Sequence, residues 1–179
     1  MNRLETELTL NRDRARTLEA FASLSPAELV TRATRSEYDP ELWWTPKDHF
    51  SHMLRVERHF NRIITAFLDG ATEDPRGAVG GNRGTTREEI LAEVNRVNEE
   101  AVTQSRDVPF EDLLRLSQEI RSETFALLAR IGDDQFDVQM PGVPWSGGTI
   151  GAVLVHSSGD HFERHWKWLT DGLAEHASG

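Results

Sequence analysis

The sequence predicts an all-α fold, an antiparallel four-helix bundle with extra short helices, and three observations support this prediction. Apolar residues recur at spacings of three and four over long segments, as on the buried face of a helix. Four segments open with residues that cap helix N-termini. No segment shows the alternation of apolar and polar residues that is typical of a strand. A chain of 179 residues suits one domain, so we expect residues 1–179 to form a single bundle.

Two helices are expected in the N-terminal part of the chain. Residues 3–22 carry a loose apolar stripe, with Arg and Glu at the other positions. Ser25 and Pro26 then have the pattern of an N-cap followed by proline at the first helical position, and Glu28 completes a capping box. This signal predicts a short helix that runs to about Arg35.

The strongest helical pattern lies at residues 45–70, which begin with Thr45, Pro46 and Asp48 as cap, proline and acid. Its apolar residues share one broad face, and basic residues lie opposite. The later helices are separated by loops rich in Gly, Pro and Asp. We expect these helices at residues 85–106, 109–132 and 149–169, with loops at residues 71–84 and 133–148.

The helix at 149–169 carries His161 and His165, four residues apart. Residues at this spacing lie on one helix face about 5 to 6 Å apart at Cβ, so both imidazoles could bind one ion. The same face carries Ile150 and Leu154, so we expect it to point into the core. Because burying an imidazole without a partner costs free energy, a metal ion is the leading candidate for that partner.

His52 is the third ligand candidate, on the core-facing side of the helix at 45–70. His49, one turn earlier, is an alternative ligand or a group that supports a ligand through a hydrogen bond. His156 lies about 140° from His161 around a continuous helix, and we expect it to pack or to face solvent. With seven histidines, a pair four residues apart arises by composition about one time in four. Histidines that serve only the core therefore remain the alternative to a metal site.

Tryptophans lie in the connections next to both histidine helices. Trp43 and Trp44 precede the helix at 45–70, and Trp145 lies in the loop at 133–148. Aromatic residues in such positions usually cover an apolar edge, although they can also line the mouth of a pocket. We expect at least one of the three to lie beside the histidines.

Composition excludes several classes of function. The net charge of -10 and the pI near 5.1 oppose a nucleic-acid-binding surface, which needs clustered Lys and Arg. The chain has no cysteine, which excludes disulfides, thiolate ligands and a cysteine nucleophile. No apolar run approaches the roughly 18 residues of a membrane span, and we expect no signal peptide. We therefore expect a cytoplasmic protein with a small-molecule substrate and neither a nucleic acid nor a membrane as partner; a homodimer is left open.

Two segments resemble motifs of the DinB-like superfamily, also described as DinB/YfiT-like. They are W-T-P-K-D-H-F-S-H-M-L-R-V-E at residues 44–57 and G-D-H-F-E-R-H at residues 159–165. The resemblance implies a four-helix bundle in which His52, His161 and His165 bind a divalent metal, nickel, zinc or iron. It also implies a class of chemistry. Related proteins include the N-terminal domain of mycothiol-dependent maleylpyruvate isomerase, S-transferases that use mycothiol or bacillithiol, and hydrolases of the ClbS/DfsB type.

Three nitrogen ligands, with no inward-facing carboxylate expected, leave coordination positions open, which is the arrangement of catalytic metal sites. We therefore expect a metal-dependent enzyme that acts on an electrophilic small molecule. It would be a thiol-dependent S-transferase or isomerase, with a low-molecular-weight thiol as a further cofactor, or a hydrolase. His49 and Trp145 are expected to support the site or to line its pocket, and no catalytic acid or base is assigned. The alternative is a non-catalytic bundle that binds a ligand or partner and keeps a structural or vestigial metal site.

Overall fold

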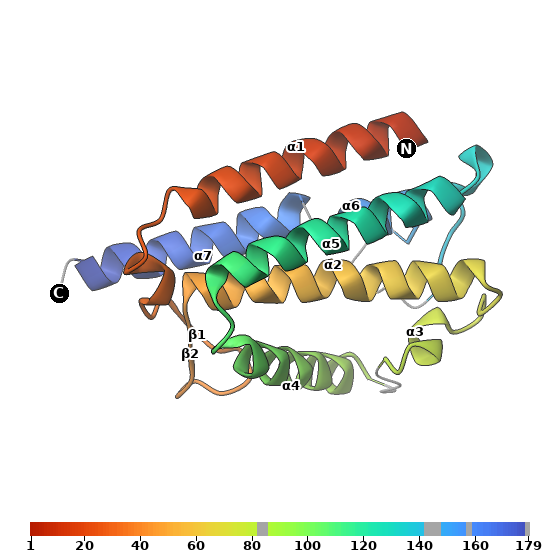
Figure 1. Cartoon of the computed structure of the whole chain (residues 1–179). Helices are drawn as coiled ribbons and strands as arrows, with labels where there is room; N and C mark the ends of the chain where they lie inside the picture. Colours follow the sequence, from red (N-terminus) through yellow and green to blue (C-terminus); the bar gives the residue numbers. More distant parts are fainter. Residues whose placement is uncertain (82–85, 142–147, 157–158, 178–179) are drawn as a thin grey trace.

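The computed structural model describes residues 1–81, 86–141, 148–156 and 159–177, and most of these are helical (Figure 1). The α-helices are α1 (Arg3–Ala22), α2 (Pro46–Leu68), α3 (Pro75–Ala78), α4 (Arg87–Ser105), α5 (Phe110–Arg130), α6 (Ile150–His156) and α7 (Gly159–Ala177). The 3-10 turns η1 (Glu28–Val30) and η2 (Asp133–Gln135) and the strands β1 (Thr34–Arg35) and β2 (Trp43–Trp44) complete the described elements. The helical class is confirmed, with one small sheet that the sequence did not indicate.

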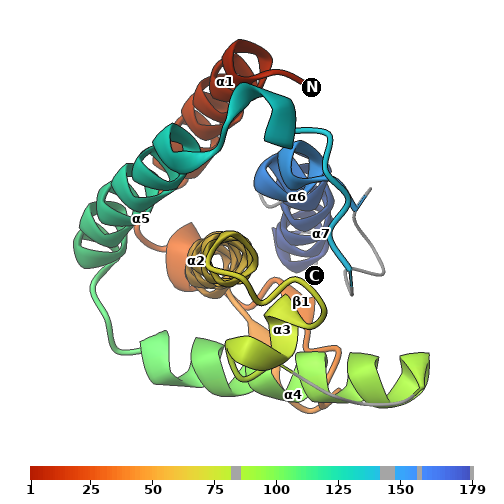
Figure 2. The same cartoon turned by 90° about the vertical axis from the view of Figure 1, so that its right-hand side faces the viewer.

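The helix α2 is central, and its start is set by its own sequence. It contacts α3, α4, α5, α6 and α7 (Figure 2). The Thr45 side chain accepts a hydrogen bond from the Asp48 N–H, and the Asp48 carboxylate accepts one from the Thr45 N–H at 2.8 Å. Pro46 occupies the first turn, where its missing N–H has no partner to lose. This cap fixes the first turns of α2, from which His49 and His52 project.

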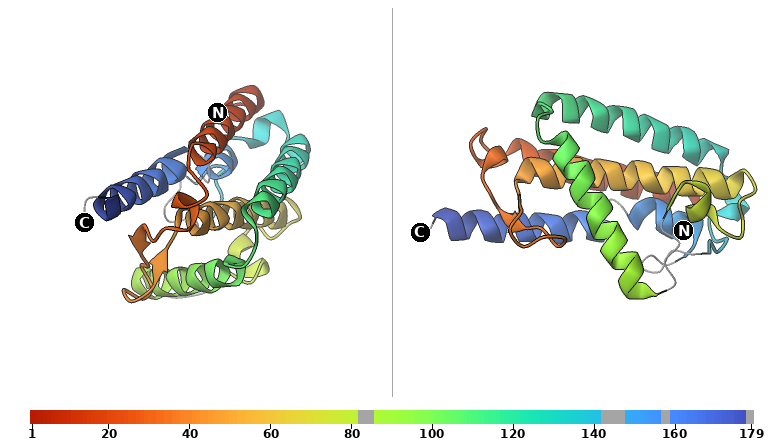
Figure 3. Two further views of the ribbon diagram at one scale, coloured as in Figure 1. Left: turned by 60° about the vertical axis from the view of Figure 1, so that its left-hand side comes forward. Right: turned by 90° about the horizontal axis from the view of Figure 1, so that it is seen from below.

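The long helices do not form a regular antiparallel bundle. α1 and α6–α7 run in one direction, whereas α2 and α5 run in the other (Figure 1). Because α2 and α5 are in contact and run in the same direction, the chain must return to the starting end of α2 before α5 begins. α3 and α4 lie on that return. α4 lies across the direction of α2 (Figures 2 and 3). The expected antiparallel four-helix bundle is therefore not confirmed. The sequence could not show this, because helical periodicity does not reveal that a helix belongs to a crossover connection.

Residues 25–35 do not form the expected helix. The start signal is present, since the Glu28 N–H donates to Ser25 Oγ at 3.2 Å, but the helix ends after one 3-10 turn. Beyond that turn the Ala33 N–H donates to the Trp44 carbonyl at 2.9 Å, and β1 and β2 pair antiparallel. The local sequence favours a helix here, but the backbone instead forms hydrogen bonds with the second strand.

Residues 33–44, which we call the strap, pack against α7 at Gly172, a residue of that helix. A Cβ atom added at Gly172 would lie 1.7 Å from the Ala33 carbonyl oxygen. No side chain larger than hydrogen fits there unless the backbone moves. Gly172 therefore allows the strap to approach α7 at the end of the molecule where α2 begins.

The helix expected at residues 149–169 is described as two helices, α6 and α7. Residues 157–158, between them, lie outside the described residues. α7 continues to Ala177, past the expected end. The loop expected at 71–84 contains α3, whose Asp74 caps the helix by accepting from the Gly77 N–H at 2.8 Å.

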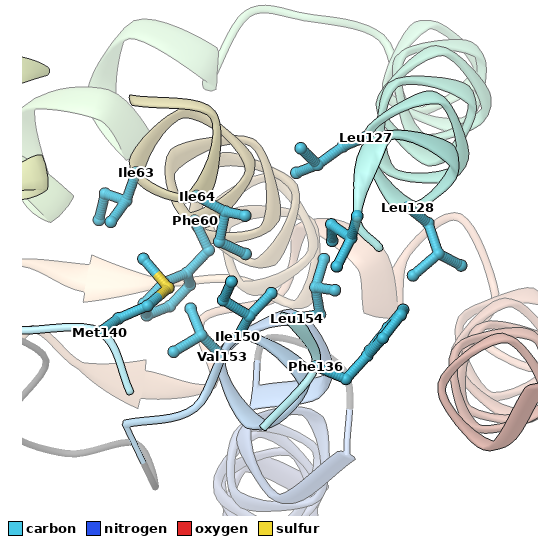
Figure 4. Packing of buried hydrophobic residues seen from close by; sticks show 11 residues of the cluster. Phe60, Ile63, Ile64, Leu127, Leu128, Phe136, Met140, Ile150, Val153 and Leu154 are labelled. Carbon is cyan, nitrogen blue, oxygen red and sulfur yellow. The ribbon is translucent and has the colours of Figure 1, made fainter. Parts of the chain in front are cut away.

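The apolar core has two parts. Figure 4 shows the first, in which side chains of α2, α5 and α6 meet Phe136 and Met140. The second joins α1, α2, α5 and α7 around Phe21, Phe50 and Leu169. His49 and His52 flank Phe50 in sequence and so belong to the end of α2 that the second part packs. Among the described helices, none combines the length and the apolar character needed to cross a membrane.

Candidate metal centre

Three histidines meet in the interior of the protein, His52 from α2 and His161 and His165 from α7. One ring nitrogen from each lies within 4.8 Å of the other two. The ring centroids are 5.3 Å apart for His52 and His161, 4.8 Å for His52 and His165, and 4.5 Å for His161 and His165. Their side chains are buried, with exposed fractions of 4%, 9% and 6% in chain order. The structure thus brings together the three histidines named from the sequence, in a cluster that could hold one metal ion.

Hydrogen bonds from outside the cluster reach His165. His49 Nδ1 lies 2.8 Å from His165 Nδ1, and His49 Nε2 lies 2.8 Å from the Thr34 hydroxyl on the strap. When His165 Nδ1 carries the ring proton, it donates to His49 Nδ1, and His49 Nε2 then donates to Thr34 Oγ1. This tautomer leaves a lone pair on His165 Nε2, which lies 3.1 Å from His161 Nε2. His49 therefore contacts the ring nitrogen of His165 that does not face His161, and it controls the orientation of the His165 ring.

Burial keeps His49, His52 and His165 neutral. Loss of solvation lowers the pKa of His49 to about 3, with a smaller effect of His161. It also lowers the pKa of His165 to about 3, with smaller effects of His49 and Arg164. The pKa of His52 is lowered well below its ordinary value by the same loss of solvation, and then by His165. At neutral pH these rings therefore carry a free lone pair, which is the form of histidine that binds metals.

Trp44 covers the cluster from the strap. Its ring centroid lies 5.2 Å from that of His52, 5.3 Å from that of His49 and 6.4 Å from that of His165. The expectation that a tryptophan of the connections lies beside the histidines is thereby confirmed. Trp145 lies outside the described residues, so its role as a pocket residue stays a prediction.

Glu99 of α4 holds Trp44 in place. Its carboxylate accepts from the Trp44 indole N–H at 2.7 Å, from the Ser36 hydroxyl at 2.6 Å and from the Arg106 guanidinium at 3.1 Å. Glu99 is buried, so each of these charge-assisted hydrogen bonds is shielded from water. Nothing in the sequence separates Glu99 from its exposed neighbour Glu100, and only the tertiary contacts identify it.

The comparisons with known proteins agree with the two histidine motifs. Residues 9–167 match the sequence pattern of the DinB superfamily. This chain belongs to the DinB superfamily. The match spans both motifs, so the resemblance that they carry is confirmed. The chain is also similar to the crystal structure of an uncharacterised protein from Escherichia coli UTI89, with a TM-score of 0.65 and 12% identity over 98% of this chain and 95% of that chain. At this identity the likeness shows the fold alone, and no curated protein matches the chain.

His156 lies closer to the histidine cluster than the sequence suggested. Its ring packs edge-on against Phe60, with centroids 5.5 Å apart, and stacks 6.2 Å from His161. Packing was expected, but the approach to His161 was not. The estimate of the angle between the two residues assumed one continuous helix, whereas His156 ends α6 and His161 belongs to α7.

An inward-facing carboxylate, which the sequence did not indicate, is present on α2. Glu57 of α2 is 8% exposed, pairs with Arg121 at 3.2 Å and accepts from the Thr124 hydroxyl at 2.6 Å. Its charge is thus already matched by a buried arginine. Among the described residues, the group with the geometry of a metal site contains histidines alone.

Proposed function

We propose that this DinB protein is a divalent-metal-dependent enzyme that acts on an electrophilic small molecule. Its reaction would be a thiol-dependent S-transfer or isomerisation, or a hydrolysis. The observation that carries the proposal is the meeting of three buried imidazole rings from α2 and α7. Membership of the superfamily supports it, because the resemblance implies a metal at these three positions.

The three histidines fit nickel, zinc or iron. Imidazole nitrogen suits each of these metals, and the chain contains no cysteine thiolate as a competing ligand. His52 Nδ1 is buried and has no hydrogen-bond partner among the described residues. Such a buried polar atom costs free energy until a ligand or water satisfies it. The contact between His49 and His165 is the kind of support that metal-binding histidines usually have.

When bound, such an ion lowers the pKa of a water or thiol and polarises a carbonyl group. His52, His161 and His165 would hold it, and His49 would keep the His165 ring oriented. Trp44, 8% exposed, excludes water on the side of the strap. Because the chain has no cysteine, any thiol must come from a low-molecular-weight compound such as mycothiol or bacillithiol. The cytoplasm, where thiols are kept reduced, is the compartment that suits this chemistry.

The competing function is a non-catalytic bundle that binds a ligand or partner and holds a metal for structure. The burial of the three histidines favours it, because structural metal sites are closed to substrate. Trp168 favours the enzyme instead. It is 38% exposed, and its ring centroid lies 5.2 Å from that of His165, so the cluster lies close to the molecular surface.

The test is the variant His161→Ala, with His176→Ala as its matched control. Both residues lie on α7, but His176 is exposed and outside the cluster. We expect metal content to fall by at least about tenfold in His161→Ala and to stay unchanged in His176→Ala. The helices should remain, because the two apolar parts of the core do not include His161. The measurements are elemental analysis of the purified proteins and circular dichroism.

Activity separates the two functions. Each protein would be assayed for thiol transfer to a panel of electrophiles, with low-molecular-weight thiols, and for hydrolysis of the same panel. Loss of activity together with metal supports the enzyme. Metal that stays bound in His161→Ala removes His161 from the site. Metal lost without any change in activity across the panel favours the non-catalytic bundle.

A further inference from the structure

A cavity of about 260 Å³ lies between α2, α4 and α5, and His52 forms part of its wall. This volume lies just below the range for pockets that bind drug-sized molecules, roughly 300 to 1,000 Å³. The cavity near Arg121, in contrast, has about 30 Å³, which is room for about one water. The larger cavity therefore has the size for a small organic ligand.

The walls of this cavity differ in character. One wall is largely apolar, with Val102 from α4 and Leu113, Leu116 and Ile120 from α5; Gln104 and Ser105 of α4 add polar groups at this wall. The other comes from α2 and is basic, with Arg55, Arg58, His59 and Arg62. A concentration of positive charge is notable in a protein whose net charge is -10. The two walls together suit a ligand with an apolar body and an anionic group.

Arg55 is the residue on the basic wall that needs a partner. Its Nη2 donates to Asn98 Oδ1 at 2.6 Å, and its buried Nε has no hydrogen-bond partner among the described residues. Loss of solvation lowers the pKa of Arg55, and no carboxylate opposes that effect. A buried charged donor without an acceptor costs free energy, which a bound anion would recover.

The neighbouring basic residues Arg58 and His59 do not need an anionic partner as Arg55 does. Arg58 makes a bidentate pair with Glu123 of α5, through Nε at 3.0 Å and Nη2 at 2.7 Å, so its charge is matched. Burial, with smaller effects of Arg55 and other arginines, lowers the pKa of His59 to about 4, so His59 is neutral at pH 7. The unmatched charge that faces the cavity is therefore that of Arg55, with the exposed Arg62 adding to the field.

We propose that this cavity binds a small organic acid, with its carboxylate against Arg55 and its apolar part against α4 and α5. The apolar wall and the partly buried Arg55, which lacks a carboxylate partner, suit a monoanion with a hydrocarbon body better than an inorganic dianion. The proposal rests on the proposed function in one respect: because His52 lines the cavity, the acid is assigned as the electrophilic substrate. Binding of the acid itself does not require the metal.

The test is calorimetric titration at constant ionic strength, with benzoate as the carboxylate probe, benzamide as its neutral analogue, and inorganic phosphate. We expect benzoate to bind the wild-type protein at least about tenfold more tightly than benzamide or phosphate. Arg55→Gln should weaken benzoate binding by roughly tenfold or more, the effect of losing a hydrogen bond to a charged group. Arg55→Lys, which keeps the charge, should retain most of the affinity and shows that the loss is not a failure to fold.

The double variant Arg130→Gln with Asp69→Asn is the control, because it removes an exposed ion pair between the ends of α2 and α5 that does not line the cavity. Its benzoate affinity should equal that of the wild type. The proposal is overturned if Arg55→Gln binds benzoate as the wild type does, or if benzamide or phosphate binds at least as tightly as benzoate. His161→Ala separates this proposal from that of the metal enzyme. Benzoate binding that persists in that variant supports a site of its own, whereas binding that disappears with the metal assigns benzoate to the metal and overturns the cavity.

Discussion

At the scale of the residue, the site depends on which nitrogen of each imidazole carries a proton. His52, His161 and His165 could be named from the sequence because helical spacing shows which positions share a buried face. The hydrogen-bond partners that set the tautomers could not be named from the sequence. Thr34 reaches His49 only because the strap folds back over α2, and no spacing along the chain signals that contact.

The neutral histidines make the stability of the metal-free protein depend on pH. The pKa is about 3 for His49 and His165 in the folded protein and about 6.5 in an unfolded chain. Below about pH 6.5 the unfolded chain takes up protons that the folded protein cannot bind. The stabilisation is therefore complete above that pH and is lost as the pH falls towards 3. Each histidine lowers the free energy of unfolding by up to about 1.4 kcal/mol per pH unit in this range.

Urea unfolding of chelator-treated protein between about pH 7 and pH 5 measures this slope. The range lies above the ordinary pKa of carboxyl groups, so histidines dominate it. His49→Phe should give a shallower slope than the wild type, and His176→Ala, which changes an exposed histidine, should leave the slope unaltered. A free energy of unfolding that does not vary over this range would contradict the burial of neutral imidazoles.

At the scale of the element, helix starts could be predicted and the connections could not. Thr45 caps α2 as the sequence indicated, and Thr86 caps α4 in the same way; a cap can be predicted because it involves residues only three positions apart. The helix expected from Ser25 to about Arg35 reached into the start of the strap, because the backbone partners of residues 33–35 lie on a second strand and leave no local signal. Glu99 connects this strap to α4, so a residue of the crossover helix helps to shape the histidine cluster.

The variant Glu99→Gln tests this connection. Its amide keeps one acceptor oxygen, but its NH₂ group would face the donors of Trp44, Ser36 or Arg106, and the guanidinium of Arg106 would lose its buried counter-charge. We expect the free energy of unfolding to fall by about 1 to 3 kcal/mol and the affinity for metal to fall with it. Urea unfolding and competition with a chelator measure the two effects.

Glu100→Gln is the control for that variant. Glu100 is the next residue on α4, is exposed and pairs with Arg96 on the surface. This substitution should change the free energy of unfolding by no more than about 0.5 kcal/mol. Equal effects of the two substitutions would mean that the buried carboxylate does not hold the strap.

At the scale of the whole molecule, the fold and the site are separable. The helical class and the family could be predicted from periodicity and two motifs. The direction of α5 relative to α2 could not, because it depends on a crossover of residues 69–109 whose helices look like any others. The two parts of the apolar core hold the helices together without the histidines.

Removal of metal should therefore lower the melting temperature without unfolding the helices at 25 °C. With free metal at about 100 times Kd, binding adds about 2.7 kcal/mol to the stability. For a chain of this size that corresponds to a shift of roughly 5 to 10 °C. Circular dichroism with and without a chelator measures both quantities, and His161→Ala should show no shift. Loss of the helical signal at 25 °C on chelation would contradict the separation of fold and site.

The hydrogen bond between His49 and His165 joins residues that are 116 positions apart. Protein synthesis releases the N-terminal part of a chain first, at about 5 to 20 residues per second. His49 and His52 therefore leave the ribosome several seconds before α7 supplies the other imidazoles of the cluster. An ion that arrives during this interval meets one helix with exposed histidines and no closed site. A metal held by all three histidines would therefore be bound only after α7 has been synthesised.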